Sequence, residues 1–197
     1  MNAGPVFDVK AAASMPARVD DQTSPAVSRI EQGSRLERAW SVLDTVLDPE
    51  VPVVSVLDLG IVRSVVEAGD ALEVVVTPTY SGCPATEVIE QGIVAALEDA
   101  GLGPVRVRLQ RAPAWTTDWM SESGRRKLRA YGISPPGPVD ASRGTPIRFS
   151  RRTVTALACP RCDSTNTERL AAFGATACKA LWRCRACGEP FEHFKPI

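Results

Sequence analysis

The chain has 197 residues, and its 23 Lys and Arg residues balance 23 Asp and Glu residues, so the formal net charge is zero. A hydrophobic fraction of 44% and a charged fraction of 23% are typical of a folded globular protein and exclude a fibrous or disordered chain. No apolar run approaches the roughly 20 residues that a membrane-spanning helix needs. Met1–Pro16 lacks a basic patch followed by an apolar core, so we expect no secretory signal and a cytoplasmic location, where cysteines serve as metal ligands or reactive thiols.

The charge is divided between the two halves of the chain. Residues 1–100 hold 6 basic and 16 acidic side chains, a balance of −10, whereas residues 101–197 hold 17 basic and 7 acidic ones, a balance of +10. Two explanations stay open. Either the halves pack together and partly neutralise each other, or the C-terminal half presents a basic surface to an acidic partner or a nucleic acid.

The apolar pattern divides the chain into four segments. Residues 1–27 hold three prolines and no apolar period, so we expect a disordered tail. Periodic apolar residues occupy 28–133, which we expect to form one domain. Recurring prolines at the start of 134–155 predict a linker. The cysteine pairs within 156–197 predict a small metal-stabilised module.

The first elements of the domain are a helix and a hairpin. Apolar residues recur at helical spacing from Ile30 to Leu47, and the helix should end at Asp48 because the ring of the following proline disfavours helical geometry there. Two β-branched runs, residues 60–66 and 71–77, flank a short Gly-Asp turn and predict a β-hairpin.

The rest of the domain completes an α+β pattern. A helix should begin at Pro84 and end before Gly101, and residues 105–109 alternate apolar and polar side chains as a half-exposed strand does. A last helix is expected over residues 117–131. The order α-β-β-α-β-α predicts a compact α+β fold in which the helices pack on one face of a short sheet.

Four cysteines near the C-terminus form two C-x2-C pairs, Cys159/Cys162 and Cys184/Cys187, separated by 21 residues. Each pair turns two thiolates onto one ion, and four thiolates satisfy tetrahedral Zn²⁺. The spacing predicts a zinc-ribbon β module in which a structural Zn²⁺ stabilises about 40 residues that bury too little surface to fold alone. An Fe–S centre on the same thiolates is the alternative, because four thiolates suit iron as well.

Two further residues of this module are possible ligands by type. Cys178 lies between the pairs, and we expect it to be a small core residue or a ribbon neighbour rather than a fifth ligand. His193 has no second histidine as a partner, so we expect it on the surface of a strand. Trp115 and Trp119 are expected to pack in a core or an interface, and nucleic-acid binding is not the favoured function because the nearby arginines do not interleave with aromatic residues.

Cys83 is the candidate reactive thiol. It precedes Pro84, which suits the first helical position because its missing N–H would be unpaired there. Cys83 would then occupy the cap position, where unpaired N–H groups and the positive end of the helix dipole stabilise a thiolate. We predict that the sulfur of Cys83 acts as a nucleophile or a metal ligand. The alternative is that Cys83 is a packed, unreactive cysteine. The single histidine lies in the predicted ribbon, so no catalytic Ser-His-Asp or Cys-His arrangement is expected.

Three segments together resemble the signature of the MIP18 family, also called the domain-of-unknown-function-59 family, whose members assist iron–sulfur cluster assembly. The segments are Asp48-Pro49-Glu50-Val51-Pro52, Val56–Val62 and Thr77–Pro84. The likeness covers about residues 35–130. With the two cysteine pairs and Phe173–Leu181 added, the whole is similar to the PaaD family, the D component encoded with bacterial phenylacetyl-CoA 1,2-epoxidase.

The resemblance implies an accessory role rather than catalysis. A member of this family would assist assembly of an iron–sulfur cluster, or its transfer, for the reductase (flavin and a 2Fe–2S cluster) or the di-iron oxygenase of the epoxidase system. Cys83 matches the family's Thr…Gly-Cys-Pro motif, and Asp48 and Glu50 match its acidic motif, so these three residues are the implied site. One thiolate cannot enclose a cluster, but a pair across a homodimer, or with a client thiol, can hold one transiently. A non-catalytic docking subunit is the alternative function.

Overall fold

The computed structural model describes residues 34–80, 82–139 and 157–197. The predicted tail, residues 1–27, and residues 140–155 of the predicted linker lie outside these ranges. The described residues belong to one compact unit. Among them, no helix has both the length and the apolar character needed to cross a membrane.

The first helix, α1 (Arg35–Leu43), is shorter than the sequence pattern predicts. It begins with a capping box in which the side chains of Ser34 and Glu37 each accept the other's backbone N–H. It ends before the predicted Asp48, because both the N–H and the hydroxyl of Thr45 donate to the carbonyl of Val42 and turn the chain away from the helix axis.

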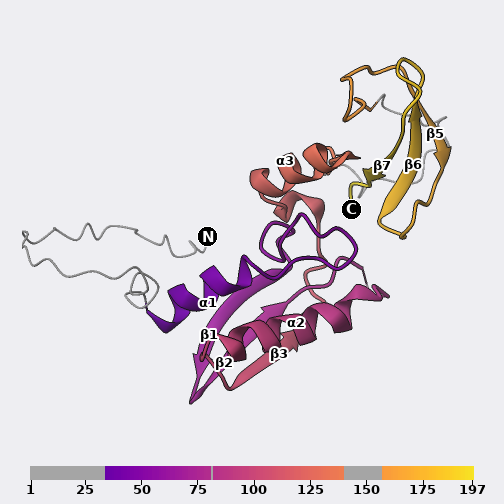
Figure 1. Cartoon of the computed structure of the whole chain (residues 1–197). Coiled ribbons are helices and arrows are strands. Elements are labelled where there is room, and N and C mark those ends of the chain that lie inside the picture. The colour runs from indigo at the N-terminus through magenta and orange to yellow at the C-terminus, as the bar shows by residue number, and fades with distance from the viewer. Residues whose placement is uncertain (1–33, 81, 140–156) are drawn as a thin grey trace, which may run out of the picture. The chain divides into compact units, whose positions relative to one another are not determined.

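The predicted hairpin and the following strand form one three-stranded sheet. β1 (Val62–Ala68) and β2 (Ala71–Val76) are antiparallel, and β3 (Val105–Leu109) lies parallel beside β2, so the strand order is β1-β2-β3. The parallel crossover runs through α2 (Ala85–Asp99). Figure 1 shows α1 and α2 on the same side of this sheet. The core between them contains Leu72, Val74, Val76, Ile89, Ile93 and Leu97. The predicted α+β fold is confirmed.

The last predicted helix of the domain is interrupted. Residues 117–131 form a short 3₁₀ helix, η1 (Thr117–Trp119), and then α3 (Glu122–Tyr131). The break occurs because the Ser121 side chain accepts the N–H of Gly124, a bond that caps a new helix. Gly132 ends α3 in the left-handed conformation, with φ of 96°.

The C-terminal module is a four-stranded sheet that includes a strand from outside the ribbon. β5 (Thr167–Ala171), β6 (Lys179–Cys184) and β7 (Pro190–Phe194) are antiparallel neighbours. The two-residue β4 (Ile133–Ser134) follows α3 and pairs in parallel with β7, which gives the order β4-β7-β6-β5. The predicted boundary between domain and linker, at residues 133 and 134, therefore falls within β4.

Side chains at the end of β7 also pack into the first domain. The ring centroids of Phe194 and Trp115 are 6.1 Å apart, and Phe194 and Cys178 belong to the same buried core as α1 and α2. The N–H of Thr117 donates to the carbonyl of Ile197 over 3.1 Å. Within the described residues, the ribbon and the domain thus share strands and a core.

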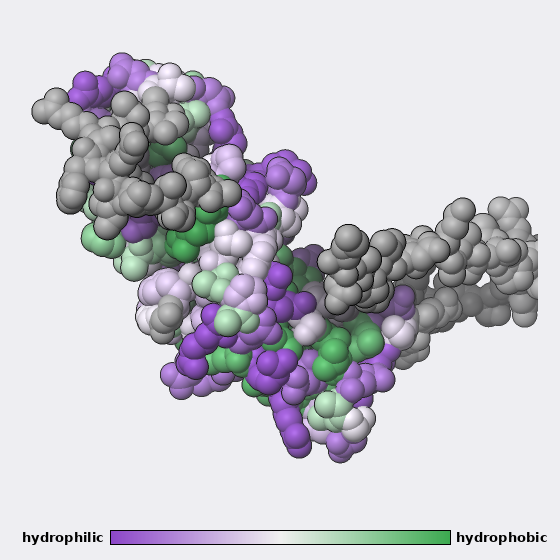
Figure 2. Space-filling view, turned by 180° about the vertical axis from the view of Figure 1, so that it is seen from behind, coloured by the Kyte–Doolittle hydropathy of each residue, from purple (hydrophilic) through white to green (hydrophobic). Residues whose placement is uncertain are grey.

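Charges of the two halves of the chain meet in ion pairs. Among the described residues, four ion pairs engage basic residues of β3 and α3: Arg108–Glu73, Lys127–Asp58, Arg125–Glu122 and Arg129–Asp163. The first two join an acidic residue before position 100 to a basic residue after it. On the face that Figure 2 shows, apolar surface is interrupted by hydrophilic side chains. These contacts favour partial neutralisation, the first of the two explanations for the charge division.

Candidate functional site

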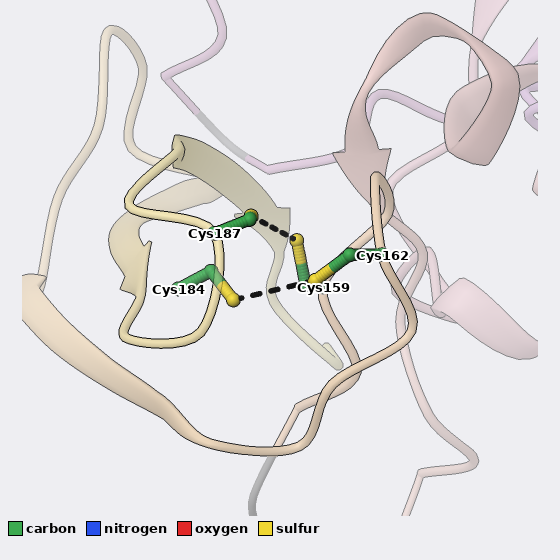
Figure 3. A group of neighbouring side chains, drawn as sticks. All are labelled: Cys159, Cys162, Cys184 and Cys187. Atoms are coloured by element: carbon green, nitrogen blue, oxygen red, sulfur yellow. Dashed lines mark hydrogen bonds between the residues drawn. The ribbon is translucent and has the colours of Figure 1, made fainter.

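The four ribbon cysteines converge as their spacing predicts (Figure 3). The Sγ atoms of Cys159 and Cys187 are 3.8 Å apart, those of Cys162 and Cys184 are 3.6 Å apart, and all four lie within 4.8 Å of one another. A tetrahedral Zn²⁺ with Zn–S bonds of about 2.3 Å separates its sulfurs by about 3.8 Å. The donor set fits one such ion. A cluster of several irons, the alternative, would place thiolates on different irons and so further apart.

The turn after the second cysteine pair supports thiolate formation. Gly188 adopts a φ of +80°, and its N–H donates to the carbonyl of Cys184 over 3.0 Å. The backbone N–H groups of Cys187 and Ala186 lower the pKa of Cys184 to about 6, against the opposing effect of burial. The loop therefore favours the charged form of Cys184. A backbone bond at Ser164 acts to lower the pKa of Cys162, but the neighbouring sulfurs outweigh it and raise this pKa to about 12.

Cys178 and His193 lie apart from the four thiols. Cys178 is buried, with its Sγ 3.0 Å from the Thr176 hydroxyl, so the prediction of a core residue is confirmed. The prediction of a surface position for His193 is wrong: the ring is buried in β7, stands edge-on to Trp182, and its Nδ1 lies 3.2 Å from the carbonyl of Ser134. Burial lowers the pKa of His193. The cause is the pairing of β4 with β7, which covers this side chain.

Cys83 lies just before α2, one residue further from the helix than predicted. The helix begins at Ala85, and its N-cap is Pro84, which already has helical angles (φ −66°, ψ −23°) and offers no capping side chain. The Cys83 carbonyl accepts the N–H of Thr86 over 3.2 Å, and the side chain is half-buried. Cys83 is therefore partly exposed, packs against the core and lies next to a helix start that no side chain caps.

The structure brings Cys83 and Asp48 to one place and Glu50 to another. Cys83 and Asp48 line the same narrow hollow, of about 10 Å³. Glu50 lines a larger cavity, of about 470 Å³, together with Lys179 and Glu192. The Oδ1 of Asp48 accepts the N–H groups of Glu50 and Val51 over 2.9 and 2.8 Å, which fixes the turn between the two cavities. Burial raises the pKa of Asp48, although these backbone bonds act in the opposite direction.

Tyr80 is a neighbour of the site that sequence reasoning did not single out. Its carbonyl accepts the N–H of Cys83 over 3.2 Å. Burial raises the pKa of the Tyr80 phenol, and the nearby sulfurs of Cys83 and Cys178 and the carboxylate of Glu50 raise it further. In the sequence, the position of Tyr80 inside the Thr77–Pro84 motif was the signal that it belongs near the site.

Asp58 is a buried anchor and not only a turn residue. It accepts hydrogen bonds from the Ser55 N–H (3.2 Å), the Ser121 hydroxyl (2.8 Å) and the Lys127 ammonium (2.5 Å). Burial raises its pKa, but these bonds together hold the pKa of Asp58 below its ordinary value. Gly60, two residues on, has φ of +67°, and a Cβ there would lie 2.4 Å from the carbonyl oxygen of Trp119. This turn therefore fixes the segment that leads into α3.

Comparison with known proteins identifies two family models along the chain. Residues 36–109 match a family described as "Iron-sulfur cluster assembly protein", and residues 143–195 match the "PaaD zinc beta ribbon domain". Among solved structures, that of a domain of unknown function, DUF59, from Bacillus anthracis matches 48% of this chain and 91% of its own, with 24% identity and a TM-score of 0.44.

Two curated relatives match as well. An Escherichia coli (strain K12) protein, named as the putative D component of 1,2-phenylacetyl-CoA epoxidase, is 45% identical over 163 residues, which cover 83% of this chain and 94% of the relative. A Porphyromonas gingivalis (strain ATCC BAA-308 / W83) "Fe-S protein maturation auxiliary factor" is 37% identical over 89 residues, 44% of this chain and 84% of the relative. The resemblance found in the sequence is thereby confirmed: the chain belongs to the PaaD family, in which an iron–sulfur cluster assembly domain precedes a zinc ribbon.

Proposed function

We propose that this chain is an accessory protein of the phenylacetyl-CoA 1,2-epoxidase system in phenylacetate degradation. It assists assembly of an iron–sulfur cluster, or its transfer, for the reductase or the oxygenase of that system in the cytoplasm. Its role is maturation and not catalysis. Membership of the PaaD family supports the setting, and the cluster assembly domain supports the chemistry.

The observation that carries the proposal is the position of Cys83. Its thiol is half-buried next to the uncapped start of α2, and it shares a hollow with the carboxylate of Asp48. Gly82 before it has open space where a side chain would be, so another protein can approach closely. Cys83 would receive the cluster as cargo, and Asp48 would accept the proton that the thiol loses. The remaining cluster positions would be filled by a second copy or by client thiols, and such incomplete ligation permits release.

The ribbon has a separate task in this proposal. Cys159, Cys162, Cys184 and Cys187 would hold Zn²⁺, which when bound cross-links two turns and so stabilises the module. The ion is structural because its four positions are filled by protein sulfurs and leave none for a substrate.

The test is the cluster content of the client. The epoxidase reductase is produced in cells with the wild-type chain, with Cys83→Ala, or with Val88→Ala, an exposed position on the same helix. We expect Cys83→Ala to lower iron and 2Fe–2S absorbance per reductase chain, with the unfolding midpoint of the accessory protein unchanged. Val88→Ala should load the reductase as the wild type does. Full cluster occupancy with Cys83→Ala would contradict the proposal.

A docking role without cluster chemistry is the second candidate function. It is favoured by the acidic residues Glu87, Glu98 and Asp99, which are exposed along α2. A partner held there would co-purify at fixed stoichiometry, separate at high salt and be indifferent to Cys83→Ala. The same purified complexes therefore distinguish the two candidates.

A further inference from the structure

The strand β3 has one edge that pairs with no other strand of the described chain, because it is the last in the order β1-β2-β3. Its other edge bonds to β2, and this pairing starts where the Leu72 N–H donates to the Pro104 carbonyl over 2.9 Å. In a parallel ladder, alternate residues of a strand bond to the same neighbour. The N–H and C=O groups of Val105, Val107 and Leu109 therefore point to the free edge.

The free edge lies beside a groove between α2 and β3. The groove has a volume of about 450 Å³ and is lined by Glu90, Gln91, Val94, Ala95, Glu98 and Val107. Val107 packs against the core on this face of the sheet, whereas Arg106 and Arg108 are exposed on the opposite face. A strand added at this edge would therefore place alternate side chains in the groove and the others beside the two arginines.

The two groove glutamates lie at opposite ends of β3. A Cβ added at Gly103 would lie 3.1 Å from the Cγ of Glu98, so Glu98 lies beside the start of the strand. The helix α2 joins two parallel strands and therefore runs back along β3 (Figure 1). Glu90 precedes Glu98 by eight residues, which is about 12 Å of helix and matches about four residues of a strand. Val94 lies halfway between them.

We propose that this edge and groove bind an extended segment of a partner protein in which basic, acidic, apolar, acidic and basic side chains follow one another. The apolar side chain fills the groove at Val94 and Val107, the basic ones pair with the two groove glutamates, and the acidic ones face the two arginines. Backbone bonds at the edge supply affinity, and the side-chain pattern supplies specificity. The inference goes beyond the proposed function, because it uses no residue of the site at Cys83.

A second copy of this chain does not fit the edge. In an antiparallel pair centred on Val107, Arg106 of one copy would lie opposite Arg108 of the other, and like charges directly opposite each other destabilise a strand pair. Charged side chains on an edge strand commonly prevent such self-pairing. This face accepts a carboxylate instead: Glu73 on β2 pairs with Arg108 over 2.9 Å. Charge complementarity therefore selects a partner segment with acidic residues on this face.

The experiment is a fluorescence anisotropy titration of the full chain, prepared with zinc, against a labelled peptide with blocked ends. The probe is Thr-Lys-Glu-Val-Glu-Lys-Thr. A matched peptide, Thr-Glu-Lys-Val-Lys-Glu-Thr, has the same composition with the charges exchanged, and a third carries an N-methylated valine that keeps the side chain and loses the N–H. Glu90→Gln and Glu98→Gln test the groove. Glu87→Gln, an exposed position of α2 outside the groove, is the control.

We expect the wild type to bind the probe, and the charge-exchanged peptide to bind about tenfold more weakly or worse because like charges then meet. The N-methylated peptide should also bind about tenfold more weakly, because it leaves a carbonyl at the edge unpaired. Each groove variant should weaken binding about threefold, since exposed ion pairs are weak, and Glu87→Gln should bind as the wild type does.

Amide hydrogen exchange shows whether the peptide pairs with the strand. The bound probe should slow exchange at Val107, whose N–H faces the free edge, and leave Arg106, whose N–H bonds to β2, unchanged. Absence of binding, equal binding of the two charge patterns, or binding without slower exchange at Val107 would overturn the inference. A dimer of the chain that the probe dissociates would also overturn it, because a second copy would then occupy the edge. The reductase loading test with Cys83→Ala is independent of these results, so the two proposals fail separately.

Discussion

The two sheets of this protein are stabilised in different ways. The β1-β2-β3 sheet buries many Leu, Ile and Val side chains against α1 and α2, so apolar burial supplies its stability. The ribbon has a separate core of five residues, Cys159, Ala180, Trp182, Cys184 and Phe191, two of which are proposed metal ligands. A core of that size cannot offset the entropy lost on ordering the module. Metal is therefore a folding element in the ribbon, whereas the iron cargo that we propose for the first domain has no part in its folding.

The two regions also contact each other through side chains and paired strands. Phe194 is the last residue of β7 in the ribbon sheet, but its ring packs against Trp115 of the domain. β4 follows α3 but pairs with β7. The domain has an apolar core of its own, yet its last contacts come from a ribbon that we expect to require metal.

Removal of the metal should have the largest effect. We expect chelation, or Cys159→Ser, to unfold the ribbon, because binding of structural Zn²⁺ contributes about 10–16 kcal/mol in small zinc modules. α1 and α2 should persist, since their core is apolar. The indole NMR signals separate the regions: Trp182 should lose its folded position, Trp115 should shift, and Trp40 on α1 should stay. Equal loss of all three signals would show that the domain cannot fold without the ribbon.

Phe194→Ala should have the next largest effect, because it removes a buried ring from the shared core. We expect a loss of about 3–5 kcal/mol in the free energy of unfolding. Zinc stoichiometry should be retained, since no metal ligand is touched. Denaturant unfolding and metal analysis measure the two quantities. Unchanged stability would mean that the regions are not coupled at this side chain.

Asp58→Asn should have a smaller, pH-dependent effect. The pKa of Asp58 is held below its ordinary value of 3.8, so the carboxylate stabilises the fold at neutral pH and loses this contribution as pH falls through the folded-state pKa. We expect the variant to be about 1–3 kcal/mol less stable at pH 7, because charge-assisted bonds to Ser121 and Lys127 are weakened. The difference from wild type should shrink below pH 4. A difference that is constant with pH would contradict this account.

Glu73→Gln should have the smallest effect. Glu73 pairs with Arg108 between β2 and β3 over 2.9 Å, but the Arg108 side chain is 54% exposed. Exposed pairs contribute less than about 1 kcal/mol and are screened by salt. Unfolding in low and high salt should therefore separate the variant from the wild type only slightly, and a large destabilisation would show that this sheet edge depends on charge.

The features that the sequence predicts correctly, such as α2 and the four converging thiols, depend on residues close together along the chain. The period of Ile89, Ile93 and Leu97 predicts α2, and the two C-x2-C pairs predict four converging thiols, because neighbours along the chain determine both. The partners of Asp58 and His193 lie far away in sequence: Lys127 is 69 residues from Asp58, and Ser134 is 59 residues from His193. No local signal reports such pairs.

The short parallel pairing of β4 with β7 has a consequence for metal retention. Coupling between two events is reciprocal, so a domain that docks more firmly when the ribbon holds its ion must also slow the escape of that ion. A ribbon fragment cut away from α3 would then surrender zinc to a competing chelator at a concentration that the whole chain withstands. A client protein that weakens the β4–β7 pairing while it binds would make the zinc easier to remove. Loss of zinc would then report that the client had bound.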